Sequence, residues 1–301
     1  GAGTDSLTIS VSGITSLGSY VMTQNGDYEV LTDASSNVIQ FKNTESLTVG
    51  SYTYVEDTAK DYFWNGTEKV LYMYDGGTWS DGYGSEWTLS GMSSSSDITI
   101  NGSSGSDSMN LSIDRSSTLT GDMTFLMGDG NDDLGVARFK NSDSVDMGAG
   151  NDTVQFYLDT SKGTPTYASL SLAKLDGGTG TDTLDFAAMG SQGSTELTLT
   201  HGGATNFENI AGGDGADIIR GDGGNNILSG EGGTDTLYGG SGNDTLYANG
   251  GTNMGAQSNN ENLYGEAGDD VIWASHGDNI IDGGTGADTI HTGNGSDTIV
   301  L

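Results

Sequence analysis

Cysteine is absent from the 301 residues, and proline occurs once, at Pro165. No disulfide framework can therefore hold the chain together. Basic residues are also scarce, because nine lysines and arginines stand against 42 acidic residues and the formal net charge is −33. A domain this acidic repels nucleic acid, so we exclude a DNA- or RNA-binding role. No apolar run approaches membrane-spanning length, and we expect no membrane insertion.

Recognisable catalytic motifs are missing as well. The three histidines, His201, His276 and His291, are scattered and form no H-E-x-x-H zinc motif. The chain has no G-x-S-x-G nucleophile elbow, and its glycine-rich turns lack the Lys-Ser/Thr that follows in a phosphate-binding loop. We therefore predict that the protein is not an enzyme.

The chain is instead rich in glycine, with 51 residues, and residues 212–300 repeat every nine. The first two units are GGDGADIIR and GDGGNNILS, and the last two are GGTGADTIH and TGNGSDTIV. One unit, 248–264, carries eight extra residues without loss of register. The eighth position is aliphatic in all nine units, and the fourth is glycine in eight of them. The sixth position is always acidic or an asparagine: Asp217, Asn226, Asp235, Asp244, Glu261, Asp270, Asn279, Asp288 and Asp297.

This pattern predicts a turn of six residues followed by a strand of three whose middle side chain points inward. Two units then form one coil that buries only two aliphatic side chains. That burial is small against the entropy cost of ordering eighteen residues. The turns also stack acidic side chains, which repel one another. A hard cation with oxygen ligands offsets both costs, and carboxylates with turn carbonyls suit calcium better than magnesium. We therefore predict that metal binding drives folding.

The repeat G-G-x-G-x-D-x-U-x resembles that of the RTX (repeats-in-toxin) family of type I-secreted bacterial proteins. The resemblance implies an all-β fold, a calcium-stabilised parallel β-roll with lateral β insertions. It also implies several Ca²⁺ ions held between successive turns by sixth-position side chains and turn carbonyls. Alternate units share an edge, so Asp217, Asp235, Glu261, Asn279 and Asp297 line one edge, and Asn226, Asp244, Asp270 and Asp288 line the other. Asparagine removes a charge and weakens its site.

Less regular copies of the repeat occupy residues 98–185, where we predict an irregular roll with loop insertions. The candidate metal ligands there are Asp107, Asp129, Asp132, Asp143, Asp152 and Asp182. Residues 186–211 are predicted to be a linking β segment, and residues 212–301 the regular roll. Within the regular roll, outward ninth positions place Tyr238 with Tyr264 on one sheet and Tyr247 with Trp273 on the other.

The N-terminal part has a different composition. Residues 1–51 are predicted to be a β segment with an irregular repeat, including strands around turns at 25–27 and 35–37. Residues 52–97 hold ten aromatic residues and are predicted to form a β insertion outside the coil, with a small core of its own. Its aromatics are most simply the filling of a hairpin core. The alternative is a platform for sugar rings, with Trp79, Tyr83 and Trp87 as candidate ligand-binding residues.

These features lead to one expected function and two alternatives. We expect a calcium-dependent structural module of a secreted bacterial cell-surface protein, either a surface-layer lattice or the repeat region of an adhesin. Its partners would be calcium and further copies or neighbouring repeats of the same protein. The first alternative is a calcium-dependent module that binds a cell-surface glycan or a peptide. The second is the non-catalytic carrier region of a secreted RTX enzyme.

Overall fold

The secondary-structure elements of the computed structural model are all β-strands among the residues described, which confirms the predicted all-β class. It describes residues 6–9, 20–25, 28–33, 36, 38–41, 46–49, 52–57, 62–65, 70–73, 78–80, 97–111, 121–137, 139–140, 142–157, 174–187, 196–198, 204–250 and 258–300. Within these ranges no helix has the length and apolar character needed to cross a membrane. The chain divides into two compact units, Gly1–Gly135 with Ser142–Asp152, and Val136–Asn141 with Thr153–Leu301.

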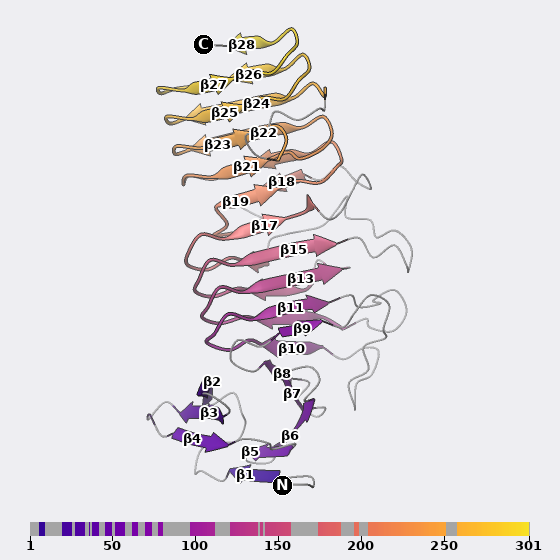
Figure 1. Cartoon of the computed structure of the whole chain (residues 1–301), viewed down its shortest axis with the longest axis vertical. Helices are drawn as coiled ribbons and strands as arrows, with labels where there is room; N and C mark the ends of the chain where they lie inside the picture. The colour runs from indigo at the N-terminus through magenta and orange to yellow at the C-terminus, as the bar shows by residue number, and fades with distance from the viewer. Residues whose placement is uncertain are drawn as a thin grey trace. The chain divides into compact units, whose positions relative to one another are not determined.

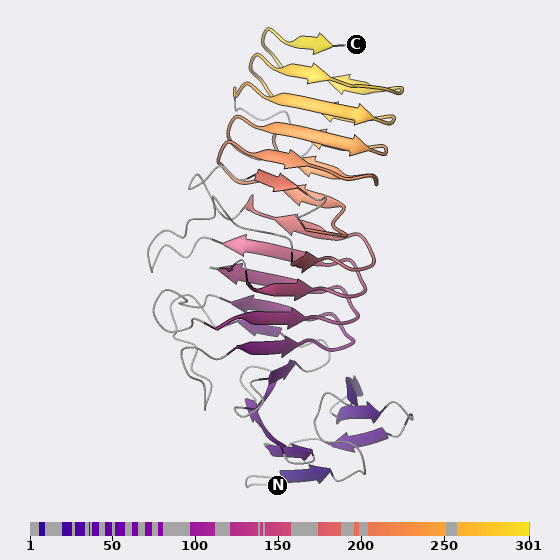
Figure 2. The same cartoon turned by 180° about the vertical axis from the view of Figure 1, so that it is seen from behind.

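The second unit contains two sheets of parallel strands, which Figures 1 and 2 show from opposite sides as stacked coils. Successive strands of the chain alternate between the two sheets. One sheet has the order β18 (Glu196–Thr198), β20 (Ile218–Arg220), β22 (Thr236–Ser241), β24 (Asn262–Ala267), β26 (Ile280–Asp282) and β28 (Thr298–Val300). The other has β15 (Thr153–Tyr157), β17 (Thr183–Asp185), β19 (Asn209–Ala211), β21 (Ile227–Ser229), β23 (Thr245–Tyr247), β25 (Val271–Trp273) and β27 (Thr289–His291). This alternation is the predicted parallel β-roll.

The strand register follows the repeat. Ile219 pairs with Leu237 and Leu228 with Leu246, so partners are eighteen residues apart. Across the interrupted unit, Leu237 pairs with Leu263, twenty-six residues on. The eight extra residues therefore leave the pairing intact, as the sequence predicted.

The core of this roll consists of the eighth-position side chains. Seven are fully buried: Ile219, Leu228, Leu237, Leu246, Leu263, Ile272 and Ile281. Ile299, in β28, is 46 % exposed because no further strand among the described residues covers that side of it. In the less regular part of the unit, aromatic rings fill the core. Phe156 stacks on Phe186 with centroids 4.7 Å apart, and Phe139 meets Phe156 edge-on.

The first unit contains coils of unequal length. In one sheet β10 (Ile98–Asn101) pairs in parallel with β12 (Met123–Leu126), which pairs with β14 (Ser144–Asp146). In the other, β9 (Thr78–Ser80) pairs with β11 (Ser108–Leu111). Ile100, Phe125 and Val145 align and are buried. These strands confirm the parallel pairing that we predicted for the irregular repeats. The remaining strands of this region are β13 (Asp133–Ala137), at the division between units, and β16 (Leu175–Asp176) of the second unit.

The beginning of the chain forms the predicted strands. β2 (Tyr20–Asn25) and β3 (Tyr28–Asp33) pair antiparallel, with Asn25 opposite Tyr28, and β4 (Val38–Phe41) pairs with β3. β1 (Ser6–Ile9) and β5 (Ser46–Val49) pair in parallel. Side chains from these strands and from the strand that follows share a small core, made of Ile9, Leu31, Phe41, Leu47, Val49 and Tyr54.

The aromatic segment differs from the predicted insertion. β6 (Tyr52–Asp57), β7 (Tyr62–Asn65) and β8 (Val70–Met73) run antiparallel from β5, and β8 then pairs in parallel with β10. The segment is therefore part of a sheet of the first unit rather than a lateral excursion. A physical reason is that the edge strands β5 and β10 would otherwise leave a row of backbone groups unpaired.

Candidate metal centre

The sixth-position side chains form a ladder of hydrogen bonds between coils. On one edge, the backbone N–H of Asn226 donates to Oδ1 of Asp244 at 2.8 Å. The N–H of Asp244 donates in turn to Asp270 at 2.8 Å, and that of Asp270 to Asp288 at 3.0 Å. Each carboxylate thus satisfies a backbone donor of the preceding coil with one of its two oxygens.

The opposite edge has the same ladder. The N–H of Asp217 donates to Asp235 at 2.8 Å, and the N–H of Asp235 donates to the carboxylate of Glu261. The N–H of Glu261 donates to Asn279 at 2.9 Å, and the N–H of Asn279 to Asp297 at 3.1 Å. Alternate units therefore share an edge. The longer side chain of Glu261 takes the place of an aspartate after the eight-residue insertion.

The second oxygen of many of these carboxylates is buried without a hydrogen-bond partner. This is the case for Oδ2 of Asp132, Asp235, Asp244 and Asp270 and for Oε1 of Glu261. All five side chains are at most 2 % exposed. A buried polar atom without a partner costs about 1–3 kcal/mol, and a charged one costs more. The same unpaired oxygen recurs at the equivalent position of successive coils. This repetition indicates a binding site for a cation that oxygen atoms coordinate.

The first-position glycines leave space beside these oxygens. A Cβ atom on Gly239 would lie 2.5 Å from Oδ2 of Asp244 and 2.6 Å from the carbonyl oxygen of Gly265 in the next coil. Gly265 stands in the same relation to Asp270 and to the carbonyl of Gly283. A side-chain oxygen and a backbone oxygen thus converge on a space that only glycine leaves open.

This oxygen set fits calcium. Ca²⁺ takes six to eight oxygen ligands at about 2.3–2.6 Å, from both carboxylates and backbone carbonyls. Among the residues that the structure describes, no three acidic or histidine side chains come together in a metal-binding group. A cation in this roll would therefore take many of its ligands from turn carbonyls. Asp235, Asp244, Glu261 and Asp270 would each supply a carboxylate oxygen.

The comparison with known families agrees with this geometry. The family model of the RTX calcium-binding nonapeptide repeat matches residues 202–237, 211–246, 229–254, 256–290 and 275–300. The chain carries an RTX calcium-binding repeat array. A search of curated proteins found no significant match. The array is thus a calcium-binding structural repeat region, and its residues match the two stacked edges described above.

Burial raises the pKa of four carboxyl groups in the RTX ladder. It raises the pKa of Asp235 to about 8 and that of Asp244 to about 6, although a backbone hydrogen bond lowers each pKa in part. Burial likewise raises the pKa of Glu261 to about 7 and that of Asp270 above its usual range. Neighbouring carboxylates add to the effect at Asp235, where Glu261 and Asp217 both contribute. A divalent cation favours the charged form, so calcium and protons compete for this RTX ladder.

We expect the calcium-free protein to become more ordered as the pH falls from about 8 to about 5. The ladder pKa values are higher in the folded roll than in the unfolded chain, where carboxyl groups titrate near 4. Folding therefore takes up protons, and its stability is lost as the pH rises through the folded pKa values. Far-UV circular dichroism of metal-depleted protein across this range measures the effect. A β signal that is constant with pH would contradict this expectation. The affinity for calcium should decrease as the pH falls, because protons compete for the same carboxylates.

The irregular copies of the repeat in residues 98–185 show the arrangement in part. The N–H of Asp107 donates to Asp132 at 2.8 Å, and that of Asp132 to Asp152 at 2.7 Å. Burial raises the pKa of Asp132 to about 8 and raises that of Asp152. On the other edge, Oδ1 of Asp143 accepts the N–H of Met123 at 2.9 Å. Asp107, Asp132, Asp143 and Asp152 are therefore brought into the same kind of ladder.

Two predicted ligands differ from the rest. Asp129 stands at the third position of its unit and is exposed, outside the buried ladder. Its charge nevertheless contributes to the raised pKa of Asp132. The carboxylate of Asp107 is already engaged, since it accepts hydrogen bonds from the backbone N–H and the hydroxyl of Ser103 at 2.6 Å and 3.0 Å. These two carboxylates fit a metal less well than Asp132 does.

The two asparagines of the ladder carry an amide N–H donor where Asp235, Asp244 and Asp270 carry an oxygen without a partner. The amide nitrogen of Asn279 donates to the carbonyls of Ser275 at 2.9 Å and Gly277 at 3.3 Å, and to Asp297 at 2.9 Å. Oδ1 of Asn226 accepts the N–H of Asp222, and its amide nitrogen donates to the carbonyl of Glu208. These contacts use turn carbonyls within the protein. Asparagine therefore weakens a site by supplying a competing donor as well as by removing a charge.

The variant Asn279→Asp is expected to bind up to one more calcium ion than the wild type. The substitution replaces the amide donor by a second carboxylate oxygen and frees the carbonyls of Ser275 and Gly277. Isothermal titration calorimetry gives the stoichiometry. The matched control is Asp288→Asn, which makes the opposite change in the next unit and should lower the stoichiometry. An unchanged stoichiometry in Asn279→Asp would contradict this interpretation.

The sequence analysis missed Glu208 as a ladder residue, because it lies in the predicted linking segment, residues 186–211. Its carboxylate accepts the N–H of Asp182 at 2.7 Å, and its own carbonyl accepts the N–H of Ile227. Glu208 therefore takes the place of a sixth-position residue, and the RTX match beginning at residue 202 includes it. Counting back nine residues from Asp217 would have found it, with Ile210 as its buried eighth position.

The aromatic candidates are only partly placed. The backbone of Trp79 lies in β9, whereas Tyr83 and Trp87 lie outside the described residues. Of the outward ninth positions, Tyr238 and Tyr264 are stacked, whereas Tyr247 and Trp273 are partners in strand register. Tyr238 lies on Tyr264 with centroids 4.9 Å apart, and Trp273 lies on His291 at 3.7 Å.

Proposed function

We propose that this chain is a non-catalytic, calcium-dependent structural module of a secreted bacterial cell-surface protein, in a surface-layer lattice or in the repeat region of an adhesin. The observation that supports this function most strongly is the ladder of buried carboxylate oxygens. Asp235, Asp244, Glu261 and Asp270 each hold an oxygen with no partner, which a bound cation would satisfy. RTX-repeat proteins are typically exported by type I secretion, which supports an extracellular location.

An extracellular setting also suits the composition. The chain has no cysteine and does not depend on oxidation to fold. Its net charge of −33 keeps the metal-free chain expanded through repulsion. Calcium binding outside the cell would neutralise part of that charge and permit both folding and contact between copies.

Calcium-dependent assembly tests the proposed role directly. The full chain is titrated with calcium while analytical ultracentrifugation follows its mass and negative-stain electron microscopy follows its form. Ordered sheets or filaments that dissolve on chelation are the expected result for a lattice module, and extended chains of copies for an adhesin repeat. A protein that folds with calcium yet stays monomeric at high concentration would contradict self-assembly.

Glycan or peptide binding by the aromatic segment is the alternative prediction for a surface role. A glycan-array signal that disappears in Trp79→Ala would favour it. The carrier role beside a catalytic domain is the other alternative, and the sequence of the parent protein decides it.

A further inference from the structure

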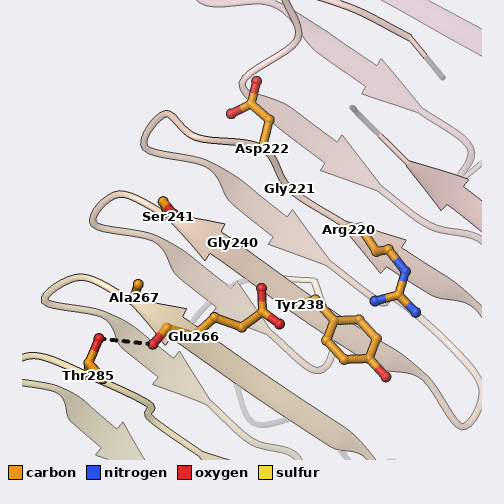
Figure 3. Close-up of a pocket in the computed structure, with 9 residues that line it drawn as sticks. All are labelled: Arg220, Gly221, Asp222, Tyr238, Gly240, Ser241, Glu266, Ala267 and Thr285. Atoms are coloured by element: carbon orange, nitrogen blue, oxygen red, sulfur yellow. Dashed lines mark hydrogen bonds between the residues drawn. The ribbon is translucent and has the colours of Figure 1, made fainter. Parts of the chain in front are cut away.

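A groove of about 520 Å³ lies on the outer side of the sheet formed by β20, β22 and β24, where these strands meet the turns. Figure 3 shows its lining as sticks. The residues are Arg220, Gly221, Asp222, Tyr238, Gly240, Ser241, Glu266, Ala267 and Thr285. The groove lies outside the carboxylate ladder and outside the aromatic segment of residues 52–97. Neither calcium binding nor the structural role accounts for it.

The floor of the groove is aromatic and carries one cation. The guanidinium carbon of Arg220 lies 3.8 Å from the ring centroid of Tyr238, and Tyr238 stacks on Tyr264. Arg220 is the single lysine or arginine in residues 204–300 of this acidic chain. Among the described residues, no carboxylate forms an ion pair with it. Its planar N–H donors are therefore available to a ligand, although many acidic side chains lie in the same roll.

Glu266 is held in the groove by a costly backbone conformation. Its φ is 72°, at a second position where the neighbouring coils of the same edge have Gly240 and Gly284 with φ of 105° and 89°. A residue other than glycine is strained in this backbone region, because its Cβ atom comes too close to the following carbonyl oxygen. The side chain is exposed, and Figure 3 shows its carboxylate lying toward the ring of Tyr238.

Glu231 provides the comparison on the opposite edge. It also has a positive φ, of 66°, but its carboxylate accepts a hydrogen bond from the hydroxyl of Ser229 at 2.8 Å. The side chain of Glu266 has no such bond to a described residue. Arg220, Tyr238 and Glu266 come from three neighbouring strands. Arg220 covers one face of the Tyr238 ring and Tyr264 the other, so an edge of the ring is left between the two charged groups. Two strand spacings amount to about 9–10 Å, roughly the length of two sugar residues.

We propose that this groove binds an acidic saccharide through a segment that contains a uronate. The guanidinium of Arg220 pairs with the carboxylate of the sugar, since its fork of donors matches a carboxylate. The C–H groups of a pyranose ring contact the edge of the Tyr238 ring, because its two faces are covered by Arg220 and Tyr264. Sugar hydroxyls donate to the carboxylate of Glu266 and exchange hydrogen bonds with the hydroxyl of Ser241.

Other ligand classes fit the groove less well. A phosphate-rich ligand would bring more negative charge than one arginine balances, next to Asp222 and Glu266. The positive charge of Arg220 would repel a basic peptide from the groove. A purely apolar ligand would leave both charged groups desolvated without partners. A uronate-containing glycan uses the cation, the ring and the acid together.

Binding is tested on the calcium-saturated full chain with two probes, a glucuronate-containing hyaluronan hexasaccharide and neutral maltohexaose. Isothermal titration calorimetry should show the acidic hexasaccharide binding at least about tenfold more tightly than the neutral one. Arg220→Gln should remove that preference, and Tyr238→Ala should abolish binding of the acidic probe. The matched control is Tyr247→Ala, an outward ninth-position tyrosine on the other sheet, which should leave binding unchanged. Circular dichroism in calcium verifies that every variant is folded.

Three outcomes would overturn the proposal. The first is no measurable binding of either probe to the folded wild type. The second is equal affinity for the acidic and the neutral hexasaccharide. The third is an equal loss in Tyr238→Ala and Tyr247→Ala, which would assign binding to a general effect of the roll. None of these outcomes bears on calcium-dependent folding, because calcium is saturating throughout.

Discussion

Removal of calcium is expected to abolish the far-UV β-sheet signal of residues 204–300, and its return is expected to restore the signal cooperatively. Each coil of the regular roll buries only two aliphatic side chains, such as Leu237 and Leu246. Ladder carboxylates such as Asp235 and Asp244 also keep an oxygen buried without a partner. Burial of these groups in the charged form without a cation is unfavourable. A calcium titration followed by circular dichroism measures the transition.

The control for this experiment is magnesium at the same concentration. Magnesium demands a tight octahedron and gives up water reluctantly, so it should restore little of the signal. Cooperativity is expected because each ladder residue contacts the one in the next coil, so a filled site orders the backbone of its neighbour. A chelated protein near pH 7 that keeps its full β signal would contradict the role of calcium in folding.

Asp270→Ala is expected to lower the stability of the calcium-loaded protein by about 3 kcal/mol and to raise the calcium concentration needed for folding. The substitution removes the oxygen that accepts the N–H of Asp244 at 2.8 Å and leaves that buried donor unpaired. It also removes the buried Oδ2 that converges with the carbonyl of Gly283 beside Gly265. Thermal unfolding at several calcium concentrations measures both effects.

Asp269→Ala is the matched control for this variant. Asp269 is the adjacent residue in the same turn, it carries the same charge, and it accepts the N–H of Ala287 at 2.8 Å. Its side chain is exposed, so water can replace the lost bond and the expected cost is below about 1 kcal/mol. Equal losses in the two variants would show that charge alone matters, and would contradict a specific role for the sixth position.

The two variants also distinguish two ladders that run beside each other. At the sixth position, the side chain of one coil accepts the N–H of the preceding coil, as Asp270 does for Asp244. At the fifth position, it accepts the N–H of the following coil, as Asn243 does for Asp269 at 3.0 Å. The fifth-position ladder is exposed and needs no cation. It joins neighbouring turns, whereas the buried ladder is the part that we expect to make folding depend on calcium.

Much of the metal region was predictable because the repeat has a strict period. The identities of Asp235, Asp244 and Asp270 and their assignment to two edges follow from counting in nines and alternating units. Inward eighth positions such as Leu228 follow from the alternation of a strand. The structure confirms these features, since parallel coils of constant length bring equivalent positions into register.

Other features were missed, and some of them no sequence pattern indicates. The repeat pattern did not identify Glu208, because its unit has few of the repeat residues and resembles an ordinary strand. The antiparallel strands of residues 52–73 carry no repeat, so nothing in their pattern indicated pairing with both β5 and β10. The contacts of Asn279 depend on the positions of carbonyls in its turn, which no residue type indicates.

The amino-acid sequence by itself determined the repeat, its register and the side chains that face the core and the turns, because a nine-residue period allows one regular way to coil. The tertiary structure alone decided which oxygen of each carboxylate is used by the backbone and which is left for a cation. It also decided that Arg220, Tyr238 and Glu266 meet in one groove. The physical reason is that these contacts join different coils, whose separation depends on hydrogen bonds between strands rather than on residues adjacent in the chain.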